Sequence, residues 1–176
     1  MLTWQKLSIT TATASLLFAS SLAAEDVTGP DAVQCGDGTD DAFVLVNIHD
    51  IATVEGNIRA QVYSDKESEF LEKGKKLVRI DVPVTDIDLS LCVPLPSPGN
   101  FSLVILHDKN ANGKADFFSE GFGFANNPKL RFGPPDVEDA TFVAAAGVTE
   151  MDINLKYILG SDTERKKKRR SLRRRR

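Results

Sequence analysis

Oxygen-bearing side chains recur at every second position in the stretch that begins at Asp108 and runs to Gly113. Flexible loops of this kind wrap hard cations such as calcium with carboxylate, amide and carbonyl oxygens. The candidate ligands are Asp108, Asn110, Asn112, Lys114 through its carbonyl, Asp116 and Glu120. The spacing resembles the start of an EF-hand loop, but Ser119 stands where a bidentate glutamate is needed and Glu120 follows it. We therefore expect weak Ca²⁺ binding and no other cofactor.

The same residues also suit a loop that binds no metal. Asn112-Gly113 is a strong turn signal, and Asn and Asp side chains accept hydrogen bonds from their own backbone in loops. Two of the early ligands are neutral amides, so the loop carries little charge to attract a dication. Both interpretations stay open on the sequence alone. A helical EF-hand is not expected, because the apolar run 101–106 enters the loop as a strand.

The histidine content limits the catalytic chemistry that this chain can build. His49 and His107 are its two histidines. A hydrolase would have to combine His107 with Asp116 and Glu120, but nothing in the sequence fixes their separation. His107 and Asp108 are adjacent in a strand, so their side chains point to opposite faces. We expect His107 to be hydrogen-bonded at the end of its strand, and we do not expect an enzyme.

The N-terminal segment is typical of a secretory signal peptide. Lys6 precedes a short apolar stretch, and small residues favour cleavage after Ala23. An exported chain matures in an oxidising space, either periplasmic or extracellular, where Cys35 and Cys92 are expected to form a disulfide. Two unpaired buried thiols are the alternative.

Charge is divided very unevenly along the chain. Residues 165–176 contain ten of the 22 Lys and Arg, whereas residues 1–164 carry 12 basic against 25 acidic residues, a net charge of −13. The cationic run suits an anionic lipid surface or another polyanion, without sequence-specific nucleic-acid recognition. The alternative is a solvated tail that folds back loosely on the acidic body. The basic residues are Arg165, Lys166, Lys167, Lys168, Arg169, Arg170, Arg173, Arg174, Arg175 and Arg176.

Short apolar or alternating runs predict an all-β fold. We expect about seven strands in an antiparallel, immunoglobulin-like or transthyretin-like β-sandwich with at most one short helix, near 64–71. Pro83 places the strand 77–82 at a sheet edge. The predicted organisation is a signal peptide (1–23), an extended lead-in without packed elements (24–41), the β-sandwich (42–160) and a disordered basic tail (161–176).

Phenylalanine is concentrated beyond the candidate loop. Six of the ten phenylalanines lie between Phe117 and Phe142. These rings either plug one end of the sandwich or form an aromatic surface for a ligand. Plugging is favoured, because the only tryptophan, Trp4, lies in the signal segment.

Several of these motifs together resemble a known family. They are His107-Asp108 with Asn110, Asn112-Gly113 and Asp116, then the stretches 120–124, 132–135 and 139–142, and earlier the stretch 56–63. In combination they are similar to the bacterial exported proteins grouped as domain of unknown function 2141, over roughly Phe43 to Leu155. The resemblance implies a small β-sandwich exported to the cell envelope, with no established activity. The loop from Asp116 to Glu120 is shorter than is usual in that family. We expect a monomer with an unknown partner in the envelope.

Overall fold

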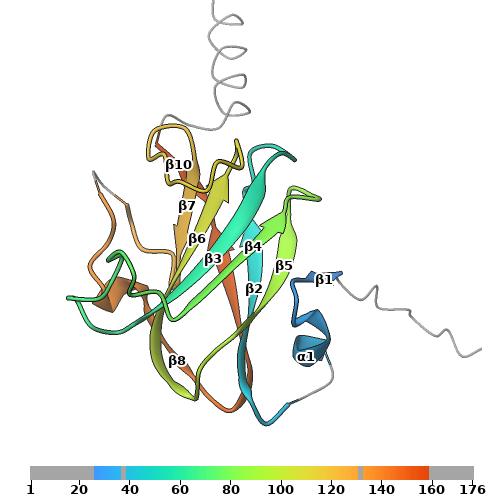
Figure 1. Cartoon of the computed structure of the whole chain (residues 1–176), viewed down its shortest axis with the longest axis vertical. Helices are drawn as coiled ribbons and strands as arrows, with labels where there is room; N and C mark the ends of the chain where they lie inside the picture. Colours follow the sequence, from blue (N-terminus) through green and yellow to red (C-terminus); the bar gives the residue numbers. More distant parts are fainter. Residues whose placement is uncertain (1–25, 37–38, 131–132, 159–176) are drawn as a thin grey trace, which may run out of the picture.

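The computed structural model describes residues 26–36, 39–130 and 133–158, which form two β-sheets packed face to face (Figure 1). The first sheet has the order β1 (Val27–Thr28), β5 (Leu89–Pro94), β2 (Ala42–His49) and β9 (Gly147–Asn154). The second has the order β10 (Lys156–Tyr157), β7 (Gly121–Phe124), β6 (Gly99–Asp108), β3 (Asn57–Ser64) and β4 (Val78–Pro83), and β8 (Thr141–Ala144) pairs with the start of β6. The helical segments are α1 (Ala32–Gly36) and the 3-10 turn η1 (Glu138–Ala140). The predicted all-β sandwich is confirmed.

Alternating apolar residues build the core between the sheets. Val44, Val46 and Ile48 of β2 face Ile58 and other residues of the second sheet, and all four are fully buried. The period of two puts these side chains on one face of each strand, as the sequence pattern predicts. Pro83 closes β4, which lies at the edge of its sheet as expected.

A second, smaller apolar cluster covers the outer face of the second sheet. Tyr63, Val104, Phe124 and Ala140 are buried there, and Phe70 packs edge-on against Tyr63. The phenylalanine-rich region therefore does not form one plug. Some rings lie in this outer cluster, Phe142 packs with Phe101 in the main core, and Phe118 is 65% exposed.

Two strand pairs differ from the antiparallel expectation. β2 runs parallel to β9, and β1 runs parallel to β5. The alternating run 148–157, whose pattern suggests one continuous strand, is divided, because β9 belongs to the first sheet and β10 to the second. Leu155 separates them: its side chain is buried and its N–H donates to the carbonyl of His49. The alternation continues through this crossing, so the sequence alone does not reveal it.

The helix predicted near 64–71 is wrong. Its residues form turns, with one helical hydrogen bond from Phe70 N–H to Lys66 O. Leu71 then takes a positive φ of 62°, which ends any helix, and its side chain stays exposed.

The lead-in is also more structured than predicted. β1 and α1 pack against β5, and the Cys35–Cys92 disulfide, with a Cα–Cα distance of 5.9 Å, holds them there. The predicted disulfide is thereby confirmed. Gly29, at φ +109°, allows the close approach, because a Cβ there would lie 2.9 Å from Leu91 Cδ1. The cross-link joins a short N-terminal unit to the sandwich.

Three loops and the end of β10 meet at one end of the sandwich, which we call the loop end. The loops join β2 to β3, β4 to β5 and β6 to β7. Their contacts include Ile51 N–H to Ile87 O (3.3 Å), Val84 N–H to Gly56 O (3.1 Å) and Ala52 N–H to the Tyr157 hydroxyl (3.0 Å). No helix among the described residues is long and apolar enough to cross a membrane. The predicted signal peptide and basic tail lie outside the described residues.

Candidate functional site

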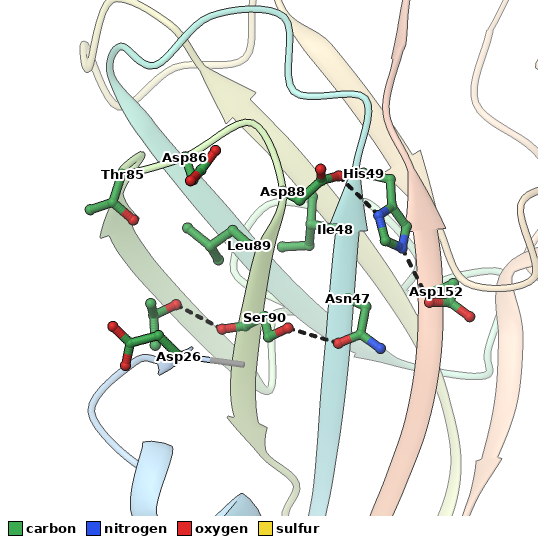
Figure 2. Close-up of a pocket in the computed structure, with 11 residues that line it drawn as sticks. Asp26, Asn47, Ile48, His49, Thr85, Asp86, Asp88, Leu89, Ser90 and Asp152 are labelled. Atoms are coloured by element: carbon green, nitrogen blue, oxygen red, sulfur yellow. Dashed lines mark hydrogen bonds and ion pairs between the residues drawn. The ribbon is translucent and has the colours of Figure 1, made fainter. Parts of the chain in front are cut away.

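An acidic cleft of about 470 Å³ opens beside the loop end on the first sheet (Figure 2). Four aspartates line it together with a single histidine: Asp26, Asp86, Asp88, Asp152 and His49. They come from the lead-in, the loop before β5, and strands β2 and β9. The concave, negative wall favours cations and repels anions. Sequence reasoning missed this cleft, because its residues are far apart in the chain and form no motif.

His49 is held between two of these carboxylates. Its Nδ1 lies 3.0 Å from Asp88 Oδ1 and its Nε2 lies 3.2 Å from Asp152 Oδ1, and Figure 2 shows both contacts. The hydrogen bonds to Asp152 and then Asp88 raise the pKa of His49 above its ordinary value. Because the folded-state pKa is raised, this pairing stabilises the fold fully below pH ~6.5. The stabilisation is lost as the pH rises through the folded-state pKa.

We therefore expect His49→Gln to destabilise the protein at pH 5.5 but not at pH 9. The expected loss at pH 5.5 is below about 1 kcal/mol, because all three side chains are well exposed and solvent screens them. Urea denaturation of wild type and variant at both pH values measures the difference. A matched variant, Asp65→Asn at the far end of the sandwich, should show no such pH dependence. A His49→Gln effect of equal size at both pH values would contradict the pairing.

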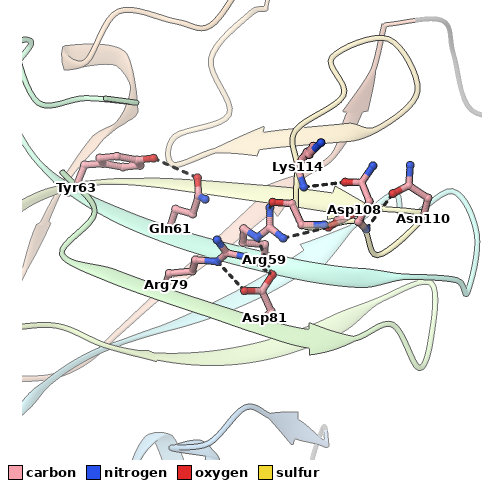
Figure 3. A network of polar contacts seen from close by, with 10 residues as sticks. Arg59, Gln61, Tyr63, Arg79, Asp81, Asp108, Asn110 and Lys114 are labelled. Atoms are coloured by element: carbon pink, nitrogen blue, oxygen red, sulfur yellow. Dashed lines mark hydrogen bonds and ion pairs between the residues drawn. The ribbon is translucent and has the colours of Figure 1, made fainter. Parts of the chain in front are cut away.

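The predicted calcium loop connects β6 to β7 and is organised by Asp108 (Figure 3). The Asp108 carboxylate is fully buried and accepts hydrogen bonds from the backbone N–H groups of Asn112 (3.1 Å) and Gly113 (2.8 Å). These bonds bend the chain back on itself, and Gly113 takes a positive φ of 77° at the bend. Asp108 therefore shapes the loop from inside.

Arg59 supplies a positive charge to this loop. Its side chain is only 3% exposed, and it donates to Asp108 Oδ2 (3.0 Å), Gly113 O (3.3 Å) and Asp81 Oδ1 (2.6 Å). Burial alone would raise the pKa of Asp81, but hydrogen bonds from Arg79 and Arg59 outweigh burial and lower it. Figure 3 shows the guanidinium between Asp81 and the loop. The Arg59 guanidinium thus binds a carboxylate and a carbonyl of the loop, two of the groups that a calcium ion would bind there.

The other predicted ligands are not gathered around one centre by their own hydrogen bonds. Asn110 Oδ1 accepts from Asn112 N–H (3.0 Å), and Asn112 Oδ1 accepts from Lys114 N–H (2.7 Å). Asp116 Oδ1 accepts from Phe118 N–H (3.1 Å), and all these ligand side chains are exposed. Within the described residues, no three His, Cys, Asp or Glu side chains lie together as a metal cluster. The turn interpretation therefore accounts for this part of the loop.

Glu120 differs from the other predicted ligands because its side chain is completely buried. Its Oε2 accepts from Asp116 N–H (2.7 Å), while its Oε1 has no hydrogen-bond partner among the described residues. Burial raises the pKa of Glu120, and the carboxylates of Asp108 and Asp116 raise it further. From the sequence, Glu120 is expected to be either the last ligand of a calcium loop or a member of the hydrolase trio. Its burial beside a second carboxylate was not predicted.

His107 points to the inner face of the sheet, away from these carboxylates. Its Nε2–H donates to Glu55 O (2.8 Å), and its Nδ1 accepts from the Tyr157 hydroxyl (2.7 Å), which itself accepts from Ala52 N–H. Burial lowers the pKa of His107, in agreement with a neutral ring, and raises that of Tyr157 to about 12. The expectation of a hydrogen-bonded histidine at the strand end is confirmed. The hydrolase trio of His107, Asp116 and Glu120 is not assembled by any contact among the described residues.

Comparison with curated proteins gives no significant match, and comparison with solved structures gives none either. A family model described as an uncharacterised protein conserved in bacteria (DUF2141) matches residues 46–152. This range begins within β2 and ends within β9, and it includes Arg59, Asp108 and Glu120. The chain therefore belongs to the DUF2141 family, in agreement with the resemblance of its motifs.

Proposed function

We propose that the protein is an exported, non-catalytic module of the bacterial cell envelope that attaches to anionic surfaces through its basic run at 165–176. The observation that carries the exported location is the Cys35–Cys92 disulfide, in which Cys92 is fully buried. Such cross-links form and persist in oxidising compartments, not in a reducing cytosol. The same location agrees with the signal peptide expected at residues 1–23.

The non-catalytic part of the proposal is supported by how the two histidines are used. Both ring nitrogens of His107 have partners inside the fold, and both of His49 contact aspartates. A general base needs a free nitrogen within reach of a substrate proton. These contacts favour structural roles for both side chains.

Attachment is supported by where the described chain ends. Tyr157 contacts Ala52 in the β2–β3 loop, so the described chain ends at the loop end with Ile158. The basic run begins seven residues later, a reach of up to ~23 Å. Each Lys or Arg near an anionic membrane contributes about 1 kcal/mol at most. The run holds ten such residues, so their combined attraction to an anionic surface is strong and independent of sequence.

One cell-fractionation experiment tests both parts. The chain with its leader is expressed in a bacterium, and a second version ends at residue 163. We expect the full chain in the envelope membrane fraction, with Cys35 and Cys92 resistant to thiol alkylation and with release by a high-salt wash. The shortened chain should move to the soluble exported fraction. A version with residues 165–176 in scrambled order is the matched control and should bind like the full chain, because the attraction is sequence-blind.

Two results would contradict the proposal. Recovery in the cytoplasm with reactive thiols would reject the exported location. Equal membrane retention of the full and shortened chains would reject attachment through the basic run.

We also propose that calcium binds weakly at the loop end and stabilises it. The buried Glu120 Oε1, which has no hydrogen-bond partner in the described part of the chain, supports this binding, while Arg59 already neutralises part of the acidic charge in the loop. Few carboxylates and a competing guanidinium are consistent with affinity in the millimolar class. A cation would stabilise the folded chain by mass action, so melting with calcium against a chelator is the relevant measurement.

A further inference from the structure

A row of charged side chains crosses the outer face of the second sheet. His107 of β6 pairs with Gly121 of β7 in an antiparallel register. The next residues, Asp108 and Glu120, are therefore neighbours at the ends of these two strands. Arg59 of β3 bonds Asp108 on one side and Asp81 of β4 on the other. We call Glu120, Asp108, Arg59 and Asp81 the charged row. Glu120 lies at one end of the charged row, and Arg59, the one cation in the row, does not contact its carboxylate.

The charges that contact one another here do not balance, and the two lysines of the loop, Lys109 and Lys114, form no salt bridge with these acids among the described residues. The group has four acids and two arginines. Arg59 bonds Asp81 and Asp108, Arg79 bonds Asp81, and Glu120 accepts only from the backbone N–H of Asp116. With every carboxylate ionised, the group carries −2. Both arginines contact Asp81, so the uncompensated charge lies on the side of Glu120 and Asp108. One dication at that side would neutralise the group.

Glu120 Oε1 is the atom of this group that lacks a partner within the described part of the chain. Glu120 is 0% exposed, and its Oε1 is a buried side-chain oxygen without a hydrogen-bond partner among residues 26–36, 39–130 and 133–158. A buried acceptor without a partner is costly, and a charged one costs more. Either a proton or a bound cation removes this cost.

We infer that the Asp108–Glu120 pair holds a divalent, oxygen-seeking cation of the calcium class, with Glu120 Oε1 as its anchoring ligand. The inference deepens the calcium part of the proposed function and rests on it. It places the ion at the buried carboxylate pair and not among the exposed side chains of Asn110, Asn112 and Asp116. Calcium accepts irregular sets of carboxylates, carbonyls and waters, whereas Mg²⁺ demands a regular octahedron. Two carboxylates at the end of a loop therefore favour calcium.

The competing explanation is a proton on Glu120 that is shared with Asp108. Glutamine has the shape of a protonated glutamate and can donate a hydrogen bond to Asp108. Under that explanation, Glu120→Gln leaves stability almost unchanged, and no cation affects the wild type. With a cation site, the same substitution abolishes the response to the cation without loss of stability in chelator.

The test is thermal melting of the full exported chain at pH 7.5 in chelator, in 10 mM CaCl₂ and in 10 mM MgCl₂. For a Kd near 1 mM we expect calcium to raise the wild-type Tm by roughly 3–6 °C, and magnesium to do less. Glu120→Gln should lose the shift, and Glu120→Asp, a second variant that keeps the charge, should weaken it. Asp116→Asn and the matched control Glu67→Gln, both at exposed positions, should retain most of it.

The outcomes separate this inference from the proposed function. If calcium shifts the Tm and Asp116→Asn abolishes the shift while Glu120→Gln keeps it, the buried site is wrong and the loop-centred site stands. If calcium does not shift the wild-type Tm, both the site and the calcium part of the proposed function are wrong, and the proton explanation holds. Envelope attachment is unaffected by either result, because the fractionation experiment tests it separately.

Discussion

Replacing Arg59 with leucine is expected to lower the free energy of unfolding by about 3–5 kcal/mol. The substitution keeps an apolar stem in the sheet but leaves the fully buried Asp108 carboxylate without its cation. It also removes the donor to Gly113 O, so the loop loses its contact with β3. Urea denaturation at pH 7 measures the change.

Arg79→Leu is the matched control for this prediction. Arg79 also contacts Asp81, but its side chain is 45% exposed. Exposed ion pairs contribute about 0–1 kcal/mol, so the expected loss is small. The double variant Arg59→Leu with Asp108→Asn should recover part of the stability, because the buried charge is then gone. Equal losses for Arg59→Leu and Arg79→Leu would show that burial of the pair with Asp108 is not what matters.

Local patterns were enough to predict most of the strands. The runs 58–63 and 86–93 alternate apolar and polar residues, and β3 and β5 occupy most of these ranges. The pattern records which face of a strand is buried, and this depends on each strand alone. The edge position of β4 was predictable from another local feature, because Pro83 lacks the backbone N–H that a central strand needs. The disulfide was predictable because the chain has only two cysteines.

The candidate site could not be predicted in the same way, because its contacts join distant positions. In an alternating strand Arg59 is expected to point into water, yet its partner Asp108 lies 49 residues away and the loop covers it. His49 contacts Asp88 and Asp152 at separations of 39 and 103 residues. The parallel pairing of β2 with β9 creates the second of these contacts, and no local signal reports it.

The spacing of Asp and Asn residues in the calcium motif was not sufficient to predict a metal site. A turn with Asp or Asn at alternate positions satisfies its own backbone donors, and a calcium loop uses the same residues. Asn110 and Asn112 illustrate the first use. The choice between the two depends on the buried surroundings of Asp108. Arg59 and Glu120 set those surroundings, and both lie outside the core of the motif.

Removing the disulfide is the second change with a large expected effect. Cys35 and Cys92 are 57 residues apart, and closing a loop of this length stabilises the fold by about 4 kcal/mol in the chain-entropy model. The variant Cys35→Ser with Cys92→Ala should therefore lose roughly 10–15 °C in Tm. Alanine is chosen at the buried position because a serine hydroxyl there would need a partner.

The structure also predicts which segment detaches first when the disulfide is removed. α1 buries no residue, and β1 has only two residues, so the cross-link supplies most of what holds residues 26–36 on β5. In the variant, proteolysis should cut near 29–36 well before the sandwich unfolds, and wild type treated with a reductant should behave in the same way. A variant that retains the wild-type Tm and the same resistance to proteolysis would show that β1 pairing alone holds the segment. The disulfide would then indicate the oxidising compartment without contributing to the stability of the fold.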